Sequence, residues 1–138
     1  MAISFFSEDI KFTLKHKLAV KNWIKATAAA EGKKAKEINY IFCSDDYLLN
    51  INQTYLDHDT FTDIVTFDNS EKEGEIISDI FISVDRTREN AKMFNVPEVD
   101  ELHRVMIHGV LHLCGFKDKT EPQKKLMREK EDFYLSAR

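Results

Sequence analysis

The sequence predicts an α+β domain, in which a small, mostly four-stranded mixed sheet packs with four to five helices. Two observations support this class. Four short segments are rich in β-branched and aromatic residues, whereas longer segments carry apolar residues at helical spacing. The strands and helices do not alternate strictly, which argues against a regular β/α repeat. With 138 residues, the chain is expected to form a single domain over residues 1–138.

The first half of the chain contains two expected strands and two expected helices. Residues 2–6 and 37–43 are strand segments, because β-branched and aromatic side chains dominate them. Residues 14–30 favour a helix, with a partial apolar stripe formed by Leu14, Leu18, Trp23 and Ile24. Ser44 is a suitable N-cap for a helix through Leu56, whose expected inner face is Leu48, Leu49, Ile51 and Tyr55.

The next part of the chain is expected to supply the other two strands. A polar loop at residues 57–62 precedes strands at residues 64–67 and 76–84. Asp85 is an expected N-cap for a helix that ends near Asn95, shortly before a proline.

Two further helices complete the predicted fold. Residues 98–114 have an apolar face and form the first of them. Residues 120–123 (TEPQ) match a capping box with proline near the helix start, so a last helix is expected through Leu135.

Composition and charge are those of an ordinary soluble domain. Hydrophobic residues make up 43% and charged residues 32%, and no stretch is long enough to span a bilayer. The start of the chain lacks the pattern of a signal peptide, so a cytoplasmic location is expected. Cys43 and Cys114 are too few for a disulfide framework. The net charge of −4 argues against nonspecific coating of nucleic acid, but it allows a local basic patch such as Lys117 and Lys119.

The segment HGVLHLCGFKD, residues 108–118, is the most informative about function. On a helix, His108 and His112 project from the same side, so both imidazoles can reach one ion. Gly115 is a helix stop, after which Asp118 can return a carboxylate. Two histidines and one oxygen ligand, with a position left open, predict one zinc ion or another divalent ion per chain. The alternative is a chance pair of histidines in an apolar helix, which would leave two costly imidazoles without partners.

The residue after the first histidine limits the possible chemistry. Zinc peptidases of the His-Glu-x-x-His type carry their general base there, whereas this chain has Gly109. Because glycine transfers no proton, a peptidase is disfavoured. Asp63 and Asp79 are expected to orient loops or to hold a ligand histidine by a hydrogen bond, and not to bind the ion.

The same segment resembles the signature of the YbeY family, which normally reads His-Gly-x-Leu-His-Leu-x-Gly-Tyr-Asp-His. Members of that family are metal-dependent endoribonucleases and ribosomal RNA maturation factors of bacteria. The similarity extends upstream to residues 52–55 (NQTY), 62–67 (TDIVTF) and 78–83 (SDIFIS), and it covers about residues 38–120. The predicted fold suits the family from end to end.

Two positions depart from the family pattern. Asp118 stands where the family has its third histidine, so the ligand set implied here is His108, His112 and Asp118. Leu56 stands where the family commonly has an arginine that is important for activity. Arg86 or Lys117 is the expected substitute for that missing positive charge and is therefore a candidate catalytic residue.

The resemblance implies an endoribonuclease specific for single-stranded RNA, acting in maturation of the 3′ end of 16S rRNA and in ribosome quality control. The implied partners are single-stranded or ribosomal RNA and the ribosome or its proteins, with no membrane, and the chain is expected to be a monomer. Three alternatives stay open. They are a non-catalytic ribosome-assembly factor stabilised by metal, a zinc-dependent hydrolase of another substrate, and an iron-dependent oxygenase, which uses a similar ligand set.

Overall fold

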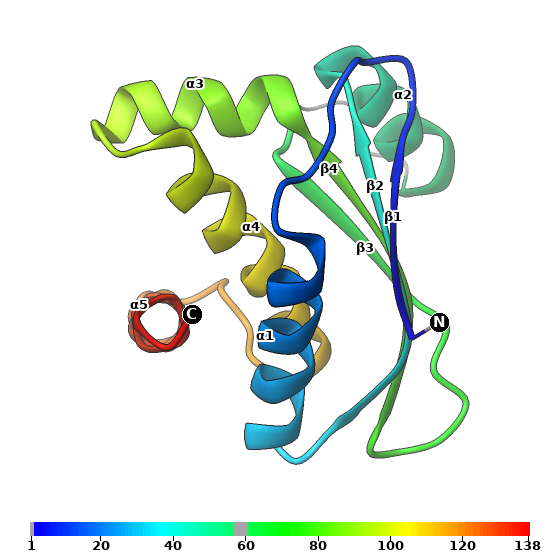
Figure 1. Cartoon of the computed structure of the whole chain (residues 1–138), viewed down its shortest axis with the longest axis vertical. Helices are drawn as coiled ribbons and strands as arrows, with labels where there is room; N and C mark the ends of the chain where they lie inside the picture. The colour runs from blue at the N-terminus through cyan, green and yellow to red at the C-terminus, as the bar shows by residue number, and fades with distance from the viewer. Residues whose placement is uncertain (1, 57–60) are drawn as a thin grey trace.

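The computed structural model describes residues 2–56 and 61–138 and confirms the predicted α+β class (Figure 1). Residues 57–60 of the predicted polar loop lie outside the described residues. The elements follow in the order β1 (Ile3–Ser7), α1 (Lys17–Ala30), β2 (Lys34–Cys43), α2 (Asp45–Leu56), β3 (Ile64–Asp68), β4 (Glu75–Ser83), α3 (Val84–Phe94), α4 (Glu98–Leu113) and α5 (Glu121–Ser136).

The four strands form one mixed sheet in the order β1-β2-β4-β3. β1 pairs with β2 and β2 with β4 in parallel, whereas β3 pairs with β4 antiparallel. The antiparallel strand β3 is therefore an edge of the sheet, next to the central strand β4. This position matters because β3, together with β4, lies against the histidine helix α4.

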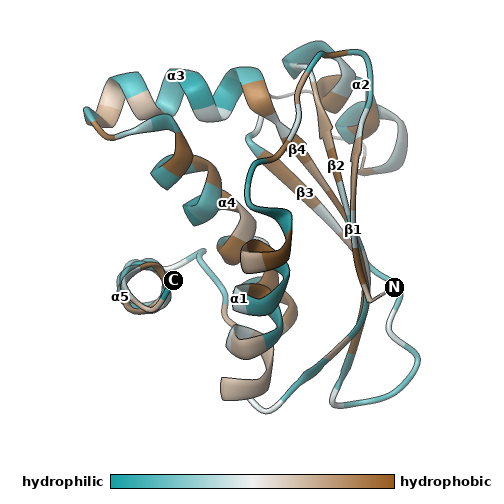
Figure 2. Cartoon of the chain, in the orientation of Figure 1, coloured by the Kyte–Doolittle hydropathy of each residue, from teal (hydrophilic) through white to brown (hydrophobic). Residues whose placement is uncertain are grey.

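Helices cover the two faces of the sheet unequally. α1 and α4 pack on one face and α2 packs on the other, against β3 and β4. The larger core lies under α1 and α4 and contains Ile38, Tyr40, Phe42, Ile76, Ile80, Ile82, Met106, Ile107 and Leu111. The smaller core lies under α2 and is centred on Cys43, Leu48 and Val65. Figure 2 shows this distribution as apolar colour on the strands, whereas α3 is mostly hydrophilic.

α4 approaches the sheet closely at Gly109. A Cβ atom at this position would lie 2.9 Å from Cδ1 of Ile64 and 3.3 Å from Cγ2 of Thr66, both on β3. One residue of α4 is also bonded to the sheet, since the Tyr40 hydroxyl donates to the carbonyl of Met106 at 3.1 Å. The absence of a side chain at residue 109 thus lets the backbone beside the first histidine come close to β3.

α5 packs on α4 and lies away from the sheet (Figure 1). Its start matches the sequence prediction, because Thr120 accepts from the amide of Gln123 and the Gln123 side chain caps the amide of Thr120. Its far end is tied to α1, where the Trp23 indole donates to the carbonyl of Tyr134 at 2.8 Å. Within the described residues, no helix is both long and apolar enough to cross a membrane.

Some predicted boundaries were wrong. The predicted strand 76–84 ends at Ser83, which is itself the N-cap of α3, with its side chain accepting from the amide of Arg86. Asp85 is therefore not the cap, and its carboxylate accepts from the amide of Asp45 at the start of α2. α1 begins at Lys17 instead of residue 14, because the preceding His16 has a left-handed backbone with φ of 56°.

Candidate functional site

The histidine helix ends as its sequence predicts. Gly115 has φ of 105°, and the amides of Gly115 and Phe116 donate to the carbonyls of His112 and Leu111. These two hydrogen bonds and the positive φ define a Schellman motif, which ends the helix and reverses the chain. The short connection to α5 then carries Asp118 back towards α4.

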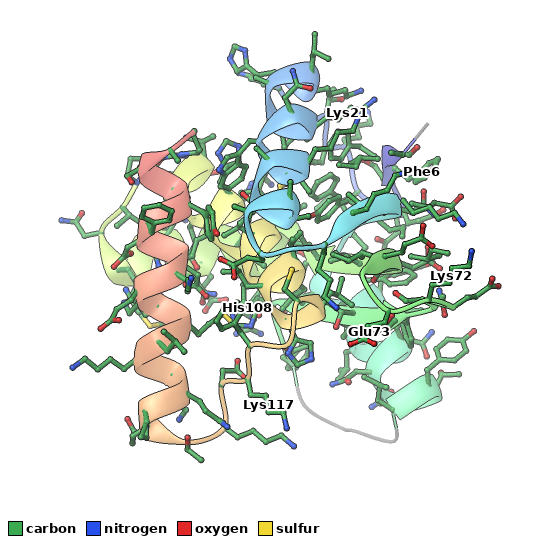
Figure 3. All side chains as sticks on the ribbon, turned by 90° about the horizontal axis from the view of Figure 1, so that it is seen from below. Phe6, Lys21, Lys72, Glu73, His108 and Lys117 are labelled. Atoms are coloured by element: carbon green, nitrogen blue, oxygen red, sulfur yellow. The ribbon has the colours of Figure 1, made fainter. Side chains whose placement is uncertain are left out.

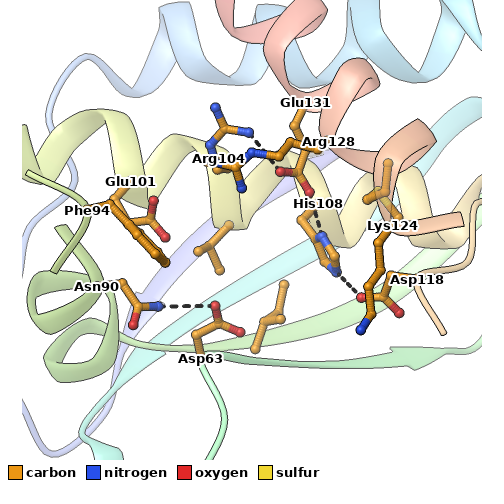
Figure 4. A pocket seen from close by; sticks show the side chains of 13 residues that line it. Asp63, Asn90, Phe94, Glu101, Arg104, His108, Asp118, Lys124, Arg128 and Glu131 are labelled. Carbon is orange, nitrogen blue, oxygen red and sulfur yellow. Dashed lines mark hydrogen bonds and ion pairs between the residues drawn. The ribbon is translucent and has the colours of Figure 1, made fainter. Parts of the chain in front are cut away.

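His108 is held between two carboxylates, one on each ring nitrogen (Figure 4). Its Nδ1–H donates to Oε2 of Glu131 at 2.7 Å, and its Nε2 lies 3.3 Å from Oδ2 of Asp118. Glu131 belongs to α5, its side chain is 7% exposed, and it also accepts from Nη1 of Arg104 at 2.9 Å. Burial opposes charge on His108, but the hydrogen bond and charge of Glu131, with help from Asp118, raise the pKa of the imidazole above its usual value.

His112 faces the same small cavity as His108 and Asp118. This cavity has a volume of about 210 Å³ and is also lined by Thr62, Asp63, Ile64 and Thr66. The three residues predicted as metal ligands are therefore brought to one place by α4, by its Schellman turn and by the edge strand β3.

The side chains that could hold an ion are only partly assembled in this conformation. Among residues 2–56 and 61–138, no three histidine, cysteine, aspartate or glutamate side chains are grouped tightly enough to hold a metal as they stand. Two of the predicted ligands do have suitable spacing. Zinc–ligand distances of 2.0–2.1 Å in a tetrahedron place neighbouring ligand atoms about 3.3 Å apart. The His108 Nε2 and Asp118 Oδ2 atoms are 3.3 Å apart, and the carboxylate behind Nδ1 is the usual partner of a metal-binding histidine. The donor set fits a divalent ion that would draw in His112.

A second cavity adjoins the first and shares Asp63, Ile64, His108 and Asp118 with it. It has a volume of about 380 Å³ and lies between α3, α4 and α5, where its remaining walls are Asn90, Phe94, Glu101, Arg104, Val105, Lys124, Met127, Arg128 and Glu131. Together the two cavities form a groove along α4 with the histidines at one end. Its walls carry both signs of charge, with cations at Arg104, Lys124 and Arg128 and carboxylates at Asp63, Glu101, Asp118 and Glu131.

The chain matches the family model described as Endoribonuclease YbeY over residues 2–138. This chain belongs to the YbeY family. Two proteins named endoribonuclease YbeY illustrate the similarity. The one from Cytophaga hutchinsonii is 52% identical over 99% of this chain and 95% of the relative, and the one from Bacteroides thetaiotaomicron is 46% identical over the full length of both. The resemblance predicted from the sequence is confirmed, and so is the prediction of an endoribonuclease at the level of the family.

A solved structure supports the fold. The solution structure of TM1509 from Thermotoga maritima superposes with a TM-score of 0.63 at 29% identity, covering 97% of this chain and 87% of that one. The likeness therefore extends over nearly the whole chain.

The two basic residues predicted to replace the family arginine lie outside the groove. The guanidinium of Arg86 is bound to Asp45, with Nη2 2.7 Å from Oδ2, and it is 3.7 Å from Glu89. Lys117 is exposed on the α4–α5 connection and lines neither cavity (Figure 3). Neither side chain is placed beside the histidines in this conformation.

Glu131 is a site residue that sequence reasoning did not single out, whereas Lys124 and Arg128 belong to the basic stretch around Lys117 and Lys119 that the sequence offers as a candidate patch. Glu131 fixes the ring of His108, and Lys124 and Arg128 line the 380 Å³ cavity. All three come from α5, which packs on α4 through contacts that local sequence patterns do not reveal. The i, i+4 and i+7 spacing of Lys124, Arg128 and Glu131 was the available signal, since it places them along one face of the helix.

Asp63 lies at the junction of the two cavities, on the side opposite α5. Its Oδ2 accepts from the Asn90 amide at 3.4 Å. Burial raises the pKa of the Asp63 carboxyl, although the nearby His108 works against this effect. Asp63 was expected to orient a loop or to hold a ligand histidine, and on His108 that second role belongs to Glu131.

Proposed function

We propose that this chain is a metal-dependent endoribonuclease that cleaves single-stranded RNA, with one zinc or other divalent ion held by His108, His112 and Asp118. The observation that carries the proposal is the state of His108. It is fixed between Glu131 and Asp118, with His112 facing the same cavity. Family membership supports the reaction class, and the groove supports the kind of substrate.

Each residue of the site has a definable task. Glu131 accepts the Nδ1 proton of His108 and so leaves Nε2 as the donor atom directed at Asp118. Gly109 keeps α4 against β3 and therefore fixes the distance between the histidines and the strand. A divalent ion bound here would polarise a phosphoryl oxygen and lower the pKa of water. No protein side chain needs to act as nucleophile, because RNA carries a 2′-hydroxyl.

The groove fits an RNA strand better than a duplex. Its 380 Å³ part lies between three helices, and α5 contributes Lys124 and Arg128 to its lining. These cations can pair with phosphates on either side of the bond that is cleaved. An unstacked strand can enter such a recess with its bases splayed apart, whereas an A-form duplex is a wider, rigid substrate that proteins read mostly from its shallow minor groove.

The remaining parts of the proposal rest on the family resemblance. We assign the chain to maturation of ribosomal RNA at the 3′ end of 16S rRNA and to ribosome quality control, as a cytoplasmic monomer with the ribosome or its proteins as partners. The opposing hypothesis is a ribosome-assembly factor in which metal only stabilises the fold. The leucine at residue 56, where relatives commonly carry arginine, is the observation that favours it.

Cleavage of labelled RNA separates the two functions. Protein stripped with a chelator and reloaded with zinc is given a single-stranded RNA and the same RNA annealed to its complement. We expect zinc-dependent cleavage of the single strand, and loss of at least about 100-fold in His112→Ala, since a ligand is removed. His103→Gln is the matched control, because His103 is on the same helix but lines neither cavity of the groove. Inert wild-type protein that still binds zinc would instead support the assembly factor.

A further inference from the structure

We propose that Phe61 is a base-stacking residue of the RNA site and that Arg86 holds its ring in place. This inference deepens the function proposed above and rests on it. Phe61 is 50% exposed, and the guanidinium of Arg86 forms a cation–π contact with its ring, with Cζ 5.3 Å from the ring centroid. One face of an aromatic ring is thus covered, while half of the residue's surface stays in contact with solvent.

The cation that supports the ring is itself fixed. Arg86 donates to both carboxylate oxygens of Asp45, from Nη2 at 2.7 Å and from Nε at 3.4 Å. Asp45 also accepts from the Ser83 hydroxyl at 3.0 Å, at the end of β4. A guanidinium held by two bonds to one carboxylate keeps a defined plane. Arg86 therefore serves as a support for Phe61, which also explains why its charge is not available inside the groove.

The supported ring lies at the edge of the groove. The next residue along the chain, Thr62, lines the 210 Å³ cavity, and the one after it, Asp63, lines both cavities. Arg86 and Asn90 lie one turn apart on the same face of α3, and Asn90 donates to Asp63 at 3.4 Å. Phe61 and Arg86 thus extend the wall of the groove by one residue beyond the cavity, on the side of α3.

Stacking is the interaction that this arrangement can offer to RNA. A single strand entering the groove presents bases with two free π faces, and proteins bind such strands by placing aromatic rings against them. A base on the open face of Phe61 would complete a stack of base, ring and guanidinium, and Arg86 would add a cation–π contribution. A π face does not distinguish one base from another, so this contact requires an unpaired base but no particular sequence.

Among the described residues, no other exposed aromatic ring has a cation over it. Phe94 is 53% exposed and lines the 380 Å³ cavity, but its ring lacks this support. Phe133 is 62% exposed on α5, its ring contacts Tyr134 edge-on, and neither of its chain neighbours lines a cavity of the groove. Tyr55 is 66% exposed and meets Phe67 edge-on, on the face of the sheet that α2 covers. Phe133 therefore offers a control of similar size and exposure that should not touch the substrate.

The test measures RNA binding to chelator-treated protein, so that cleavage does not interfere, with wild type, Phe61→Ala, Phe61→Tyr and Phe133→Ala. The probes are a fluorescent single-stranded RNA and a set of the same RNA in which one nucleotide at a time is abasic. We expect Phe61→Ala to raise Kd roughly 5- to 150-fold, as loss of one stacked base does elsewhere. Phe61→Tyr and Phe133→Ala should stay close to wild type.

The abasic set makes the test specific for stacking. At one position, removal of the base should weaken binding to wild type but leave the Kd of Phe61→Ala unchanged, because the variant has already lost the partner of that base. Equal Kd values for wild type and Phe61→Ala, or a loss that adds at every abasic position, would overturn the stacking role. Zinc-loaded wild type that cleaves RNA in that case keeps the proposed function intact, whereas wild type that neither binds nor cleaves RNA overturns both.

Discussion

Replacing Glu131 with glutamine tests whether the carboxylate behind His108 prepares the imidazole for a metal ion. Glu131 is nearly buried and accepts from two donors, Nδ1–H of His108 and Nη1 of Arg104. Glutamine preserves size and shape, but one end of its amide donates, so it can accept from only one of these two groups. Glu131→Gln therefore removes one charge-assisted hydrogen bond without opening a cavity.

Two effects of known size follow from this change. A hydrogen bond to a charged group contributes about 1.5–3 kcal/mol, so the metal-free variant should lose about that much free energy of unfolding. The loss of the partner that orients a metal-binding histidine typically weakens metal affinity by about 10–100-fold. In the metal-free protein, the pKa of His108 should also fall, because the charge that raises it is gone.

Zinc affinity measured by competition with a chromophoric chelator, and stability measured by urea unfolding of the metal-free protein, give the two quantities separately. Asp132→Asn is the matched control, since Asp132 is also bonded to Arg104 but is 60% exposed and does not touch His108. We expect this control to bind zinc like wild type and to lose less than about 1 kcal/mol. If Glu131→Gln bound zinc as tightly as Asp132→Asn does, the Glu131–His108 bond would have no role in metal binding.

Three further predictions concern the helices that surround the groove. Burial and then the charge of Arg138 lower the pKa of His103 to about 4, so the stability that the neutral imidazole contributes is complete above about pH 6.5 and is lost as the pH falls towards 4. Urea unfolding across this pH range should therefore show a smaller loss of stability in His103→Gln than in wild type. Parallel curves of stability against pH would refute this prediction. Gly109→Ala gains about 1 kcal/mol of helix propensity but should lose about 1–3 kcal/mol by overpacking against Ile64, so the urea midpoint should fall or stay level. A variant more stable than wild type by the full ~1 kcal/mol would mean that α4 has room to move away from β3. Thr120→Ala removes the N-cap of α5 and should cost about 0.5–2 kcal/mol by the same measurement, whereas an unchanged midpoint would mean that the cap contributes nothing.

The sequence predicted those features that short-range physics determines. The end of α4 at Gly115 and the start of α5 at Thr120 follow from hydrogen bonds within a few residues, and both are confirmed. The four strands and the mixed sheet follow from composition and from the order of the elements. The predicted ligands around residues 108–118 share one cavity for the same reason, because the turn that joins them is local.

Errors arose where distant parts of the chain override local preference. β2 begins at Lys34, well before the apolar run that marked it, because it pairs there with Glu75 of β4 and Lys36 forms an ion pair with that residue. Tyr55, expected on the inner face of α2, is 66% exposed, whereas Asn52 is buried. The apolar pattern of α2 was too short to define its inner face, because the helix covers only part of the sheet.

The ion-pair partners of the charged residues at the site could not be predicted either, because they lie far away in the sequence. Arg86 was predicted to supply the positive charge that the family arginine would otherwise bring to the site. Asp45, 41 residues away, binds it in the fold. Glu131 lies 23 residues from His108, and only the packing of α5 on α4 brings the two together. That His108, His112 and Asp118 face one cavity could be predicted because they are close in sequence, whereas the partners that hold their side chains could not.

The carboxylate of Asp118 would lower the net positive charge of a metal ion bound at the proposed site. A divalent ion with two neutral imidazoles and one aspartate has a net charge of about +1, whereas three imidazoles would leave about +2. The ion would then attract a phosphate less strongly and activate water less. Arg86 cannot make up this difference, because Asp45 neutralises it outside the groove. Lys124 and Arg128 line the cavity that Asp118 also lines, and they add two positive charges from α5. If the chain binds RNA as proposed, Lys124 and Arg128 would therefore supply part of the positive charge that faces the phosphates.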